Sequence, residues 1–135
     1  MSGLRHLVQA LRACAEQPLP AAVSSAARWH FLDALGVGLA ATSAEAGAPY
    51  RGVGRALAVG GPSSVLGQSQ GAAPADAALV NGGLMHSLEF DDTHTGSIIH
   101  GSSVVAAAAL AVAQARQRSG ADMLGAYVRG WEALA

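Results

Sequence analysis

The chain has 135 residues and a net charge of −1, with 8 basic residues against 9 acidic ones. This length suits one compact domain or a piece of a larger one, and the scattered arginines argue against a nucleic-acid partner. A single cysteine, Cys14, excludes a disulfide framework and a cysteine-based zinc site. The longest apolar run, 104–113, is too short to cross a bilayer and the N-terminus lacks a signal-peptide core, so we expect a cytoplasmic protein without membrane contact.

The core is expected to be thin. Hydrophobic residues make up 51% of the chain but aromatic residues only 4%, so burial must come from alanine and small aliphatic side chains. Such side chains remove little apolar area from water, and that area sets the stabilisation. We therefore expect a second copy, a complementing chain or a continuation of this chain to cover part of the surface.

The N-terminal half predicts three helices. An apolar stripe at helical spacing precedes Pro18, and its members are Leu4, Leu7, Val8 and Leu11. A second helix is expected over 21–41, where Gly36 and Gly38 indicate a close crossing with another helix. A third is expected over 49–59, and the segment 63–67 fits either a short strand or an extended link.

The C-terminal half predicts three more helices and completes an all-α fold class. Pro74 opens a helix that is expected to reach Leu88 or beyond, with backbone approaching backbone or a ligand at 81–83. The next is expected over 104–117, with a serine of the segment 100–103 as N-cap. The last is expected over 121–135, with Asp122 as its cap.

Polar side chains concentrate between 81 and 103, at the junction of the fourth and fifth predicted helices. This stretch holds three of the five histidines and three carboxylates: His86, His94, His100, Glu89, Asp91 and Asp92. Such a density between apolar segments indicates either a site or a solvated connection.

One interpretation of the cluster is proton transfer beside an anion. If the fourth helix continues past Leu88, Glu89 and Thr93 stack at a spacing of four residues, and His100 follows at the next helix start. Free N–H groups at that helix end favour an anionic ligand, and Ser102 and Ser103 offer further hydrogen bonds. A histidine there can exchange a proton with the ligand.

Two other interpretations stay open on spacing alone. A metal site would draw its ligands from Glu89, Asp91, Asp92, His94 and His100. Adjacent aspartates on a helix, however, point about 100° apart, and there is no HExxH pattern. In the structural interpretation the carboxylates cap helix ends or pair with arginines, His86 is a half-buried packing residue, and His30 is structural.

These residues resemble the MmgE/PrpD family, which includes 2-methylcitrate dehydratase and cis-aconitate decarboxylase. The resemblance is carried by Asn81-Gly82, by the segment 86–94 (HSLEFDDTH) and by His100-Gly101-Ser102. It extends outward to 33–36 (DALG) and 127–132 (YVRGWE), and so spans nearly the whole chain. Glu89 stands where the family usually has aspartate, and Gly101 where it usually has proline.

The resemblance implies a cofactor-independent lyase that acts on a small polycarboxylate. It also implies a role in propionate metabolism. By position, the implied catalytic residues are Glu89, Asp92, Thr93, His94 and His100, and the implied substrate-binding residues are Asp91, Ser102 and Ser103. No metal or other cofactor is implied, and the expected macromolecular partner is a second copy of this chain, as a homodimer, or a complementing chain.

Family members are several-fold longer, with a smaller lid domain and a downstream active-site lysine, whereas this chain has no lysine. We therefore expect residues 1–135 to form part of the N-terminal helical domain, from a truncated or split gene, and to have negligible activity alone. The alternatives are a non-catalytic helical fragment that packs with a separately encoded remainder and, third, a metal-dependent hydrolase.

Overall fold

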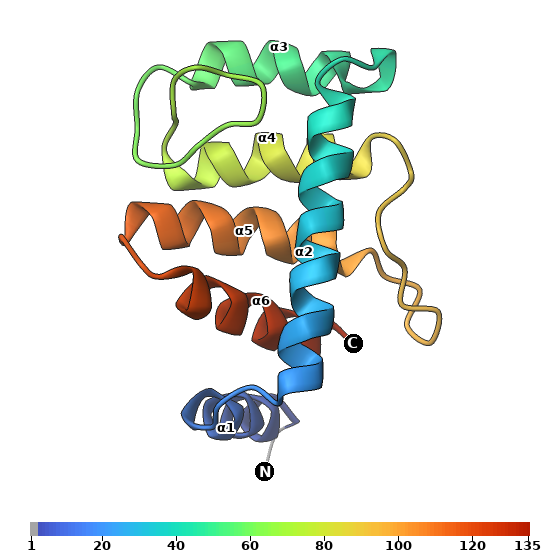
Figure 1. The fold of residues 1–135 in the computed structure, drawn as a ribbon, viewed down its shortest axis with the longest axis vertical. Coiled ribbons are helices and arrows are strands. Elements are labelled where there is room, and N and C mark those ends of the chain that lie inside the picture. Colours follow the sequence, from blue (N-terminus) through green and yellow to red (C-terminus); the bar gives the residue numbers. More distant parts are fainter. Residues whose placement is uncertain (1–2) are drawn as a thin grey trace.

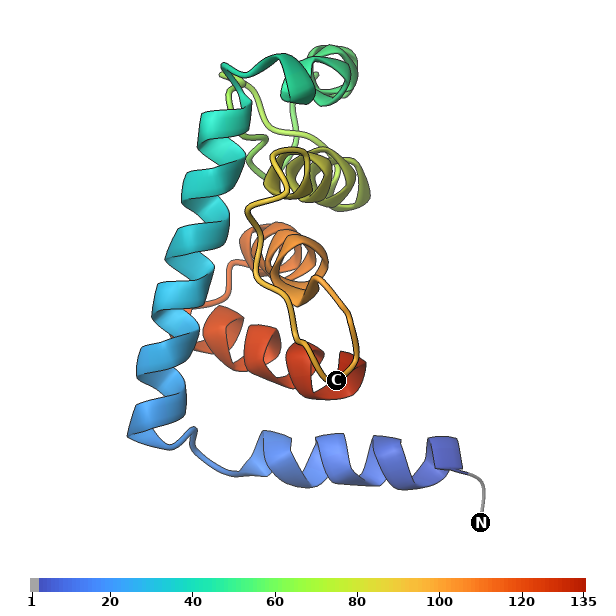
Figure 2. The ribbon, with the colours of Figure 1, turned by 90° about the vertical axis from the view of Figure 1, so that its right-hand side faces the viewer.

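The longest helix, α2 (Ala21–Ala41), runs past a stack of shorter helices. In this computed structural model, which describes residues 3–135, the stack consists of α3 (Ala48–Leu57), α4 (Pro74–His86), α5 (Gly101–Ala115) and α6 (Gly120–Leu134). Figures 1 and 2 show these helices one beside the next, with α2 crossing them. α1 (Gly3–Glu16) lies beyond α6, and a 3₁₀ turn, η1 (Glu45–Gly47), leads from α2 into α3.

The all-α fold class is confirmed. Across residues 3–135 the regular elements are helical, and β-structure is limited to the isolated bridges Ser63–Ala72 and His94–Ile99. The segment 63–67 is thus an extended link, because a single bridge does not make a strand. None of the helices in the described part of the chain is both long and apolar enough to span a membrane.

Small residues bring the helices close together, as the sequence predicts. A Cβ on Gly82 of α4 would lie 3.0 Å from the Ser103 carbonyl oxygen of α5, and one on Gly38 of α2 would lie 3.0 Å from Met85 Cγ of α4. The close crossing expected at 36–38 is therefore real at Gly38, whereas Gly36 faces open space. Close approach matters here because buried alanines such as Ala106 and Ala107 fill little volume.

Three predicted helix ends are wrong. α4 ends at His86 rather than at Leu88, because the Glu89 N–H donates to the His86 carbonyl oxygen and Glu89 turns into a left-handed conformation (φ 55°). His100, not a serine, is the N-cap of α5. Ser119, not Asp122, caps α6, and Asp122 returns the bond in a capping box.

The ends of the stack are held less firmly than its centre. α1 buries none of its residues, and the Arg129 Nη2 of α6 donates to the Ala15 carbonyl oxygen at 3.2 Å.

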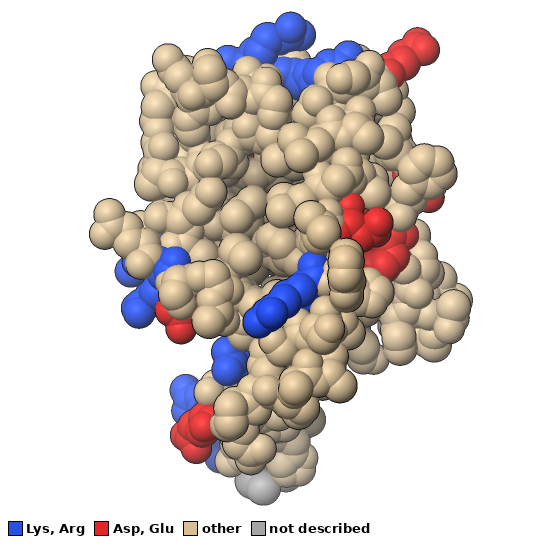
Figure 3. Space-filling model, viewed as in Figure 1, with Lys and Arg blue, Asp and Glu red and all other residues tan. Residues whose placement is uncertain are grey.

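α2 leaves the apolar side chains of Trp29 and Leu32 mostly exposed. Figure 3 shows charged side chains gathered in a few places on the face that α2 crosses.

Candidate active site

The loop 87–100 between α4 and α5 carries the predicted site residues. It folds back on itself, because the His94 N–H donates to the Ile99 carbonyl oxygen at 2.9 Å and the Ile98 N–H donates to that of His94 at 2.7 Å. Figure 2 shows the loop leaving α4, passing α5 and reaching the C-terminal end of α6 before it returns. Residues of α4, α5, α6 and α2 therefore meet around it.

Asp91 joins two imidazoles in what we call the Asp91 cluster (His86, Asp91 and His100). Its side chain is fully buried, with one carboxylate oxygen 2.9 Å from His86 Nδ1 and the other 3.5 Å from His100 Nδ1. The two rings lie 5.1 Å apart between centroids. The hydrogen bond to Asp91 raises the pKa of His86, against an opposing effect of burial.

Thr93 and His100 are brought together, and Glu89 lies apart from them. Thr93 Oγ1 is 3.3 Å from His100 Nδ1, so this nitrogen faces both a hydroxyl and the Asp91 carboxylate. The Glu89 side chain is 74% exposed, and its carboxylate lies 3.7 Å from His86 Nε2. The predicted stacking of Glu89 and Thr93 on one helix is wrong, because α4 has already ended.

Asp92 faces a different set of groups, which we call the Asp92 network (Asp92, Ser102, Tyr127 and Trp131). Its two carboxylate oxygens accept from the Ser102 backbone N–H at 3.1 Å and from Ser102 Oγ at 2.6 Å. One of them also lies 3.2 Å from His30 Nδ1 of α2. Asp92 thus caps the first turn of α5 from outside the helix, as the structural interpretation of the aspartates expects.

Two aromatic side chains of α6 complete this network. Ser102 Oγ contacts the Tyr127 hydroxyl, and Trp131 Nε1 donates to that hydroxyl at 3.0 Å. Tyr127 is buried and meets Phe31 edge to face, with centroids 5.4 Å apart. Burial raises the pKa of Tyr127, and the hydrogen bonds with Ser102 and Trp131 oppose that rise.

The remaining predicted site residues, Ser103 and His94, lie outside the Asp91 cluster and the Asp92 network. Ser103 is buried, and its Oγ donates to the His100 carbonyl oxygen at 3.2 Å within the first turn of α5. His94 is exposed at the far end of the loop, where Nδ1 lies 2.6 Å from Ser97 Oγ. Its ring meets the Trp131 ring edge on, at 6.4 Å.

A pocket of about 400 Å³ opens beside the Asp92 network. It is lined by the loop and by α2 and α6, with His30, Asp92, Thr93, His94, Tyr127, Trp131 and Glu132 as its polar or aromatic residues. Thr93 therefore links the pocket to His100 of the Asp91 cluster. Among residues 3–135, the lining of this pocket includes the carboxylates of Asp92 and Glu132 and no arginine or lysine.

Sequence reasoning missed His30, Tyr127 and Trp131 as neighbours of the loop. His30 lies 62 positions before Asp92 in an apolar helix, so only the tertiary crossing of α2 brings it near. Tyr127 and Trp131 belong to the segment 127–132 that carries part of the family resemblance. Their spacing of four residues on one helix face was the available signal.

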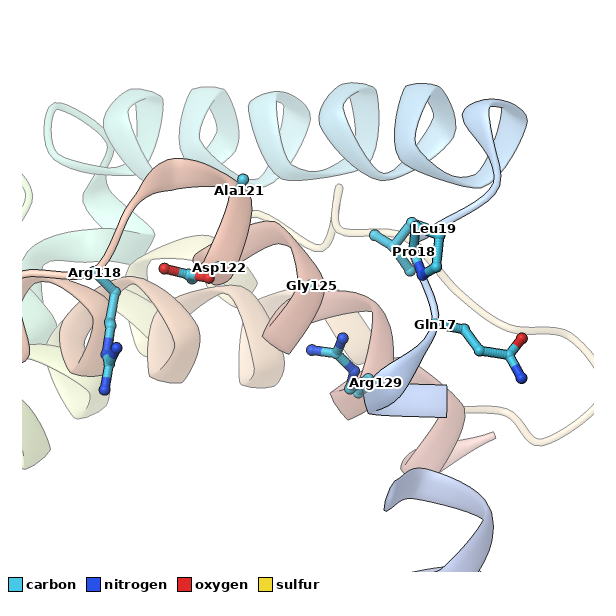
Figure 4. Close-up of a pocket in the computed structure, with 8 residues that line it drawn as sticks. All are labelled: Gln17, Pro18, Leu19, Arg118, Ala121, Asp122, Gly125 and Arg129. Carbon is cyan, nitrogen blue, oxygen red and sulfur yellow. The ribbon is translucent and has the colours of Figure 1, made fainter. Parts of the chain in front are cut away.

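A second pocket of similar volume lies between the α1–α2 connection and α6 (Figure 4). It contains Arg118 and Arg129, together with Asp122, which is already engaged in the capping box. Arg129 reaches across to α1 and donates to the Ala15 carbonyl oxygen. This pocket shares no residue with the loop and belongs to the attachment of α1.

Comparison with known proteins finds a matching family and a similar curated protein. The model of the MmgE/PrpD N-terminal domain matches residues 5–135. A curated cis-aconitate decarboxylase-like protein of Aspergillus oryzae, oryM, is 34% identical over 79 aligned positions, and the alignment covers 53% of this chain and 16% of that protein. The match thus spans about a sixth of that relative, and no solved structure matches the chain. Because the family model covers nearly the whole sequence, this chain belongs to the MmgE/PrpD family through its N-terminal domain.

Proposed function

We propose that this chain supplies part of the active site of a lyase that acts on a small polycarboxylate, of the 2-methylcitrate or cis-aconitate type. The observation that carries the proposal is the contact of Thr93 with His100 at the start of α5, next to the pocket. Family membership and the similarity to a cis-aconitate decarboxylase-like protein support it.

His100 is the proposed proton-transfer residue. Its Nδ1 faces the buried Asp91 carboxylate, which orients the ring as carboxylates orient catalytic histidines elsewhere. The ring is partly exposed, with 37% of the side chain accessible, so Nε2 is the nitrogen that exchanges a proton with a ligand. Thr93 Oγ1 contacts Nδ1 of the same ring, and Thr93 also lines the pocket, so it connects the ring to the place where a ligand can bind.

Either reaction of this class needs such a residue. Dehydration removes a proton next to a carboxylate and expels the β-hydroxyl, whereas decarboxylation delivers a proton to the carbanion that loss of CO₂ leaves. Neither requires a redox cofactor. Asp92, His94, Ser102 and Ser103 then act as supports: Asp92 and Ser102 fix the start of α5, and His94 borders the pocket.

The expected anion site at the α5 N-terminus needs correction. The Ser102 N–H at this helix end is not free for a substrate carboxylate, because it already donates to Asp92. Ser102 and Ser103 are also both buried. With Asp92 and Glu132 also lining the pocket, a substrate with two or three carboxylates requires cationic groups from outside residues 3–135. The complete active site therefore includes a further domain or chain, and residues 1–135 alone should not turn over substrate.

A chimeric enzyme tests the proposal. Residues 1–135 replace the matching segment of an active family lyase, and turnover is measured with cis-aconitate and with 2-methylcitrate. We expect turnover, and a loss of at least about 100-fold with His100→Ala, while the control His6→Ala on α1 leaves the rate unchanged. Full turnover by the folded His100→Ala chimera would refute the role of His100, and turnover by residues 1–135 alone would refute the need for a further part.

A second candidate is a non-catalytic helical module. It is favoured by the apolar side chains that α2 leaves exposed and by the absence of buried residues on α1. Such a module would co-purify with a partner chain, and the complex would have no lyase activity. Lyase activity of that complex would instead support the first candidate.

A further inference from the structure

The three side chains of the Asp91 cluster have the composition and spacing of a metal site. One ligand atom from each of His86, Asp91 and His100 lies within 4.8 Å of those of the other two. We propose that this cluster binds a divalent transition-metal ion of the zinc class through two imidazoles and one carboxylate. The inference goes beyond the proposed lyase function and does not depend on it.

The measured separations fit such an ion. Zinc bonds to imidazole nitrogen and to carboxylate oxygen are about 2.0–2.2 Å long, so neighbouring ligand atoms of a tetrahedral site lie about 3.3–3.5 Å apart. In the Asp91 cluster a single carboxylate oxygen, Oδ1 of Asp91, lies 3.2 Å from His86 Nδ1 and 3.5 Å from His100 Nδ1. One carboxylate oxygen is thus already at about the ligand-to-ligand spacing of a zinc site from both imidazole nitrogens.

The charge around Asp91 also favours a cation. Its carboxylate is fully buried, and the ion pairs that residues 3–135 show for it are both with imidazoles. A buried carboxylate is costly unless a positive charge neutralises it. His86 is the last residue of α4, where the helix dipole is negative and attracts a cation. The opposing positive end of α5 is already occupied by the Asp92 carboxylate.

The ligands are held by well-packed helix ends. His86 closes α4, His100 is the N-cap of α5, and these helices approach closely where Gly82 meets the Ser103 carbonyl oxygen. The two imidazoles are therefore placed before any ion arrives, which lowers the entropic cost of binding. The exposed parts of both rings give an ion access from solvent.

The ligand types select the class of metal. Two imidazole nitrogens and one carboxylate oxygen suit Zn²⁺, Co²⁺, Ni²⁺ or Cu²⁺, whereas Mg²⁺ and Ca²⁺ prefer oxygen ligands throughout. Three protein ligands leave at least one position for water. An ion bound here would also engage the His100 ring that we assign to proton transfer, so it should inhibit a lyase that contains this chain.

Metal titration of the purified, tag-free and metal-free chain tests the inference. CoCl₂ should produce visible ligand-field absorption that saturates at one ion per chain, and ZnCl₂ should abolish this absorption by displacement. His86→Ala and His100→Ala should each weaken binding at least tenfold. His94→Ala is the matched control, since it removes a histidine of the same loop that lies outside the cluster, and its affinity should equal that of the unchanged chain.

Two results would overturn the inference: no saturable Co²⁺ absorption, or binding that His86→Ala and His100→Ala leave unchanged. Because His86 is half-exposed, its replacement should leave the fold intact, and circular dichroism checks this. The titration measures binding by residues 1–135 and requires no turnover. A chimera without turnover would therefore not affect the conclusion on metal binding. A failed metal titration would likewise not affect the proposed lyase function.

Discussion

Asp91 and Asp92 are adjacent in sequence but belong to different environments. Asp91 is enclosed and faces the imidazoles of His86 and His100. Asp92 accepts hydrogen bonds from the backbone and side chain of Ser102, whose hydroxyl contacts Tyr127. The first aspartate contacts two imidazoles that we propose to exchange protons or to bind metal, and the second fixes the helix that carries one of them. Two neighbouring residues of one loop can thus have different roles, one facing the imidazoles and the other fixing the start of a helix.

The largest expected effect is on stability, from Asp92→Ala. This change removes the acceptor for the Ser102 N–H and leaves buried polar groups at the start of α5 without a partner. We expect a loss of about 2–3 kcal/mol in the free energy of unfolding, measured by urea denaturation. Asp92→Asn is the control, because it keeps one oxygen as acceptor and should lose less. Equal stability of Asp92→Ala and the unchanged chain would contradict the support role.

Tyr127→Phe should have the next largest effect. It keeps the ring that packs on Phe31 but removes the hydroxyl that Trp131 Nε1 donates to. The hydroxyl loses its contacts with Ser102 and Trp131, but Ser102 Oγ still donates to Asp92 and Trp131 Nε1 still reaches Ser102 Oγ, so the expected loss is about 1 kcal/mol in the same denaturation experiment. A loss equal to that of Asp92→Ala would show that the hydroxyl, not the carboxylate, holds the network together.

Asp91→Asn should change stability least among these substitutions. It removes a buried charge and leaves two partly exposed imidazoles that water can solvate, so the change should stay below about 1 kcal/mol. Metal binding should fall at least tenfold in the same variant, as in His86→Ala. A loss of stability as large as that of Asp92→Ala would erase the distinction between the two aspartates.

A small pH effect should come from the Asp92 network. Because burial raises the pKa of Tyr127 above its ordinary value near 10, the unfolded chain releases this proton before the folded one does. The contribution of Tyr127 to stability is therefore complete below about pH 10 and is lost as pH rises through the folded pKa. Urea denaturation at pH 9 and pH 11 should show a smaller decrease for Tyr127→Phe than for the unchanged chain. An identical decrease would argue against a buried, un-ionised Tyr127.

Helix positions were largely predictable from the sequence, and their junctions were not. Proline and apolar spacing placed α2 at the residues where it is found, and glycine at position 38 correctly predicted a close crossing. The end of α4 was missed because Leu88 continues the apolar stripe, while the left-handed turn at Glu89 has no glycine to signal it. Glu89 consequently lies in solvent rather than beside Thr93.

The sequence predicts contacts in the site only between residues that lie close together along the chain. Thr93 and His100 lie seven residues apart in one loop, and their contact follows from the way that loop returns to α5. The approach of His30 to Asp92 depends on the path of α2 across the stack (Figure 1), which spacing along the chain does not encode. The substrate, the further active-site groups and the pairing of chains stay predictions.

Histidine ring resonances, followed by two-dimensional NMR in the metal-free chain, test the division between the aspartates most directly. The account predicts that Asp91→Asn shifts the ring signals of His86 and His100 and leaves His30 in place, whereas Asp92→Asn shifts His30. Unchanged signals of His86 and His100 in Asp91→Asn would contradict it, because the carboxylate would then not hold the two imidazoles together.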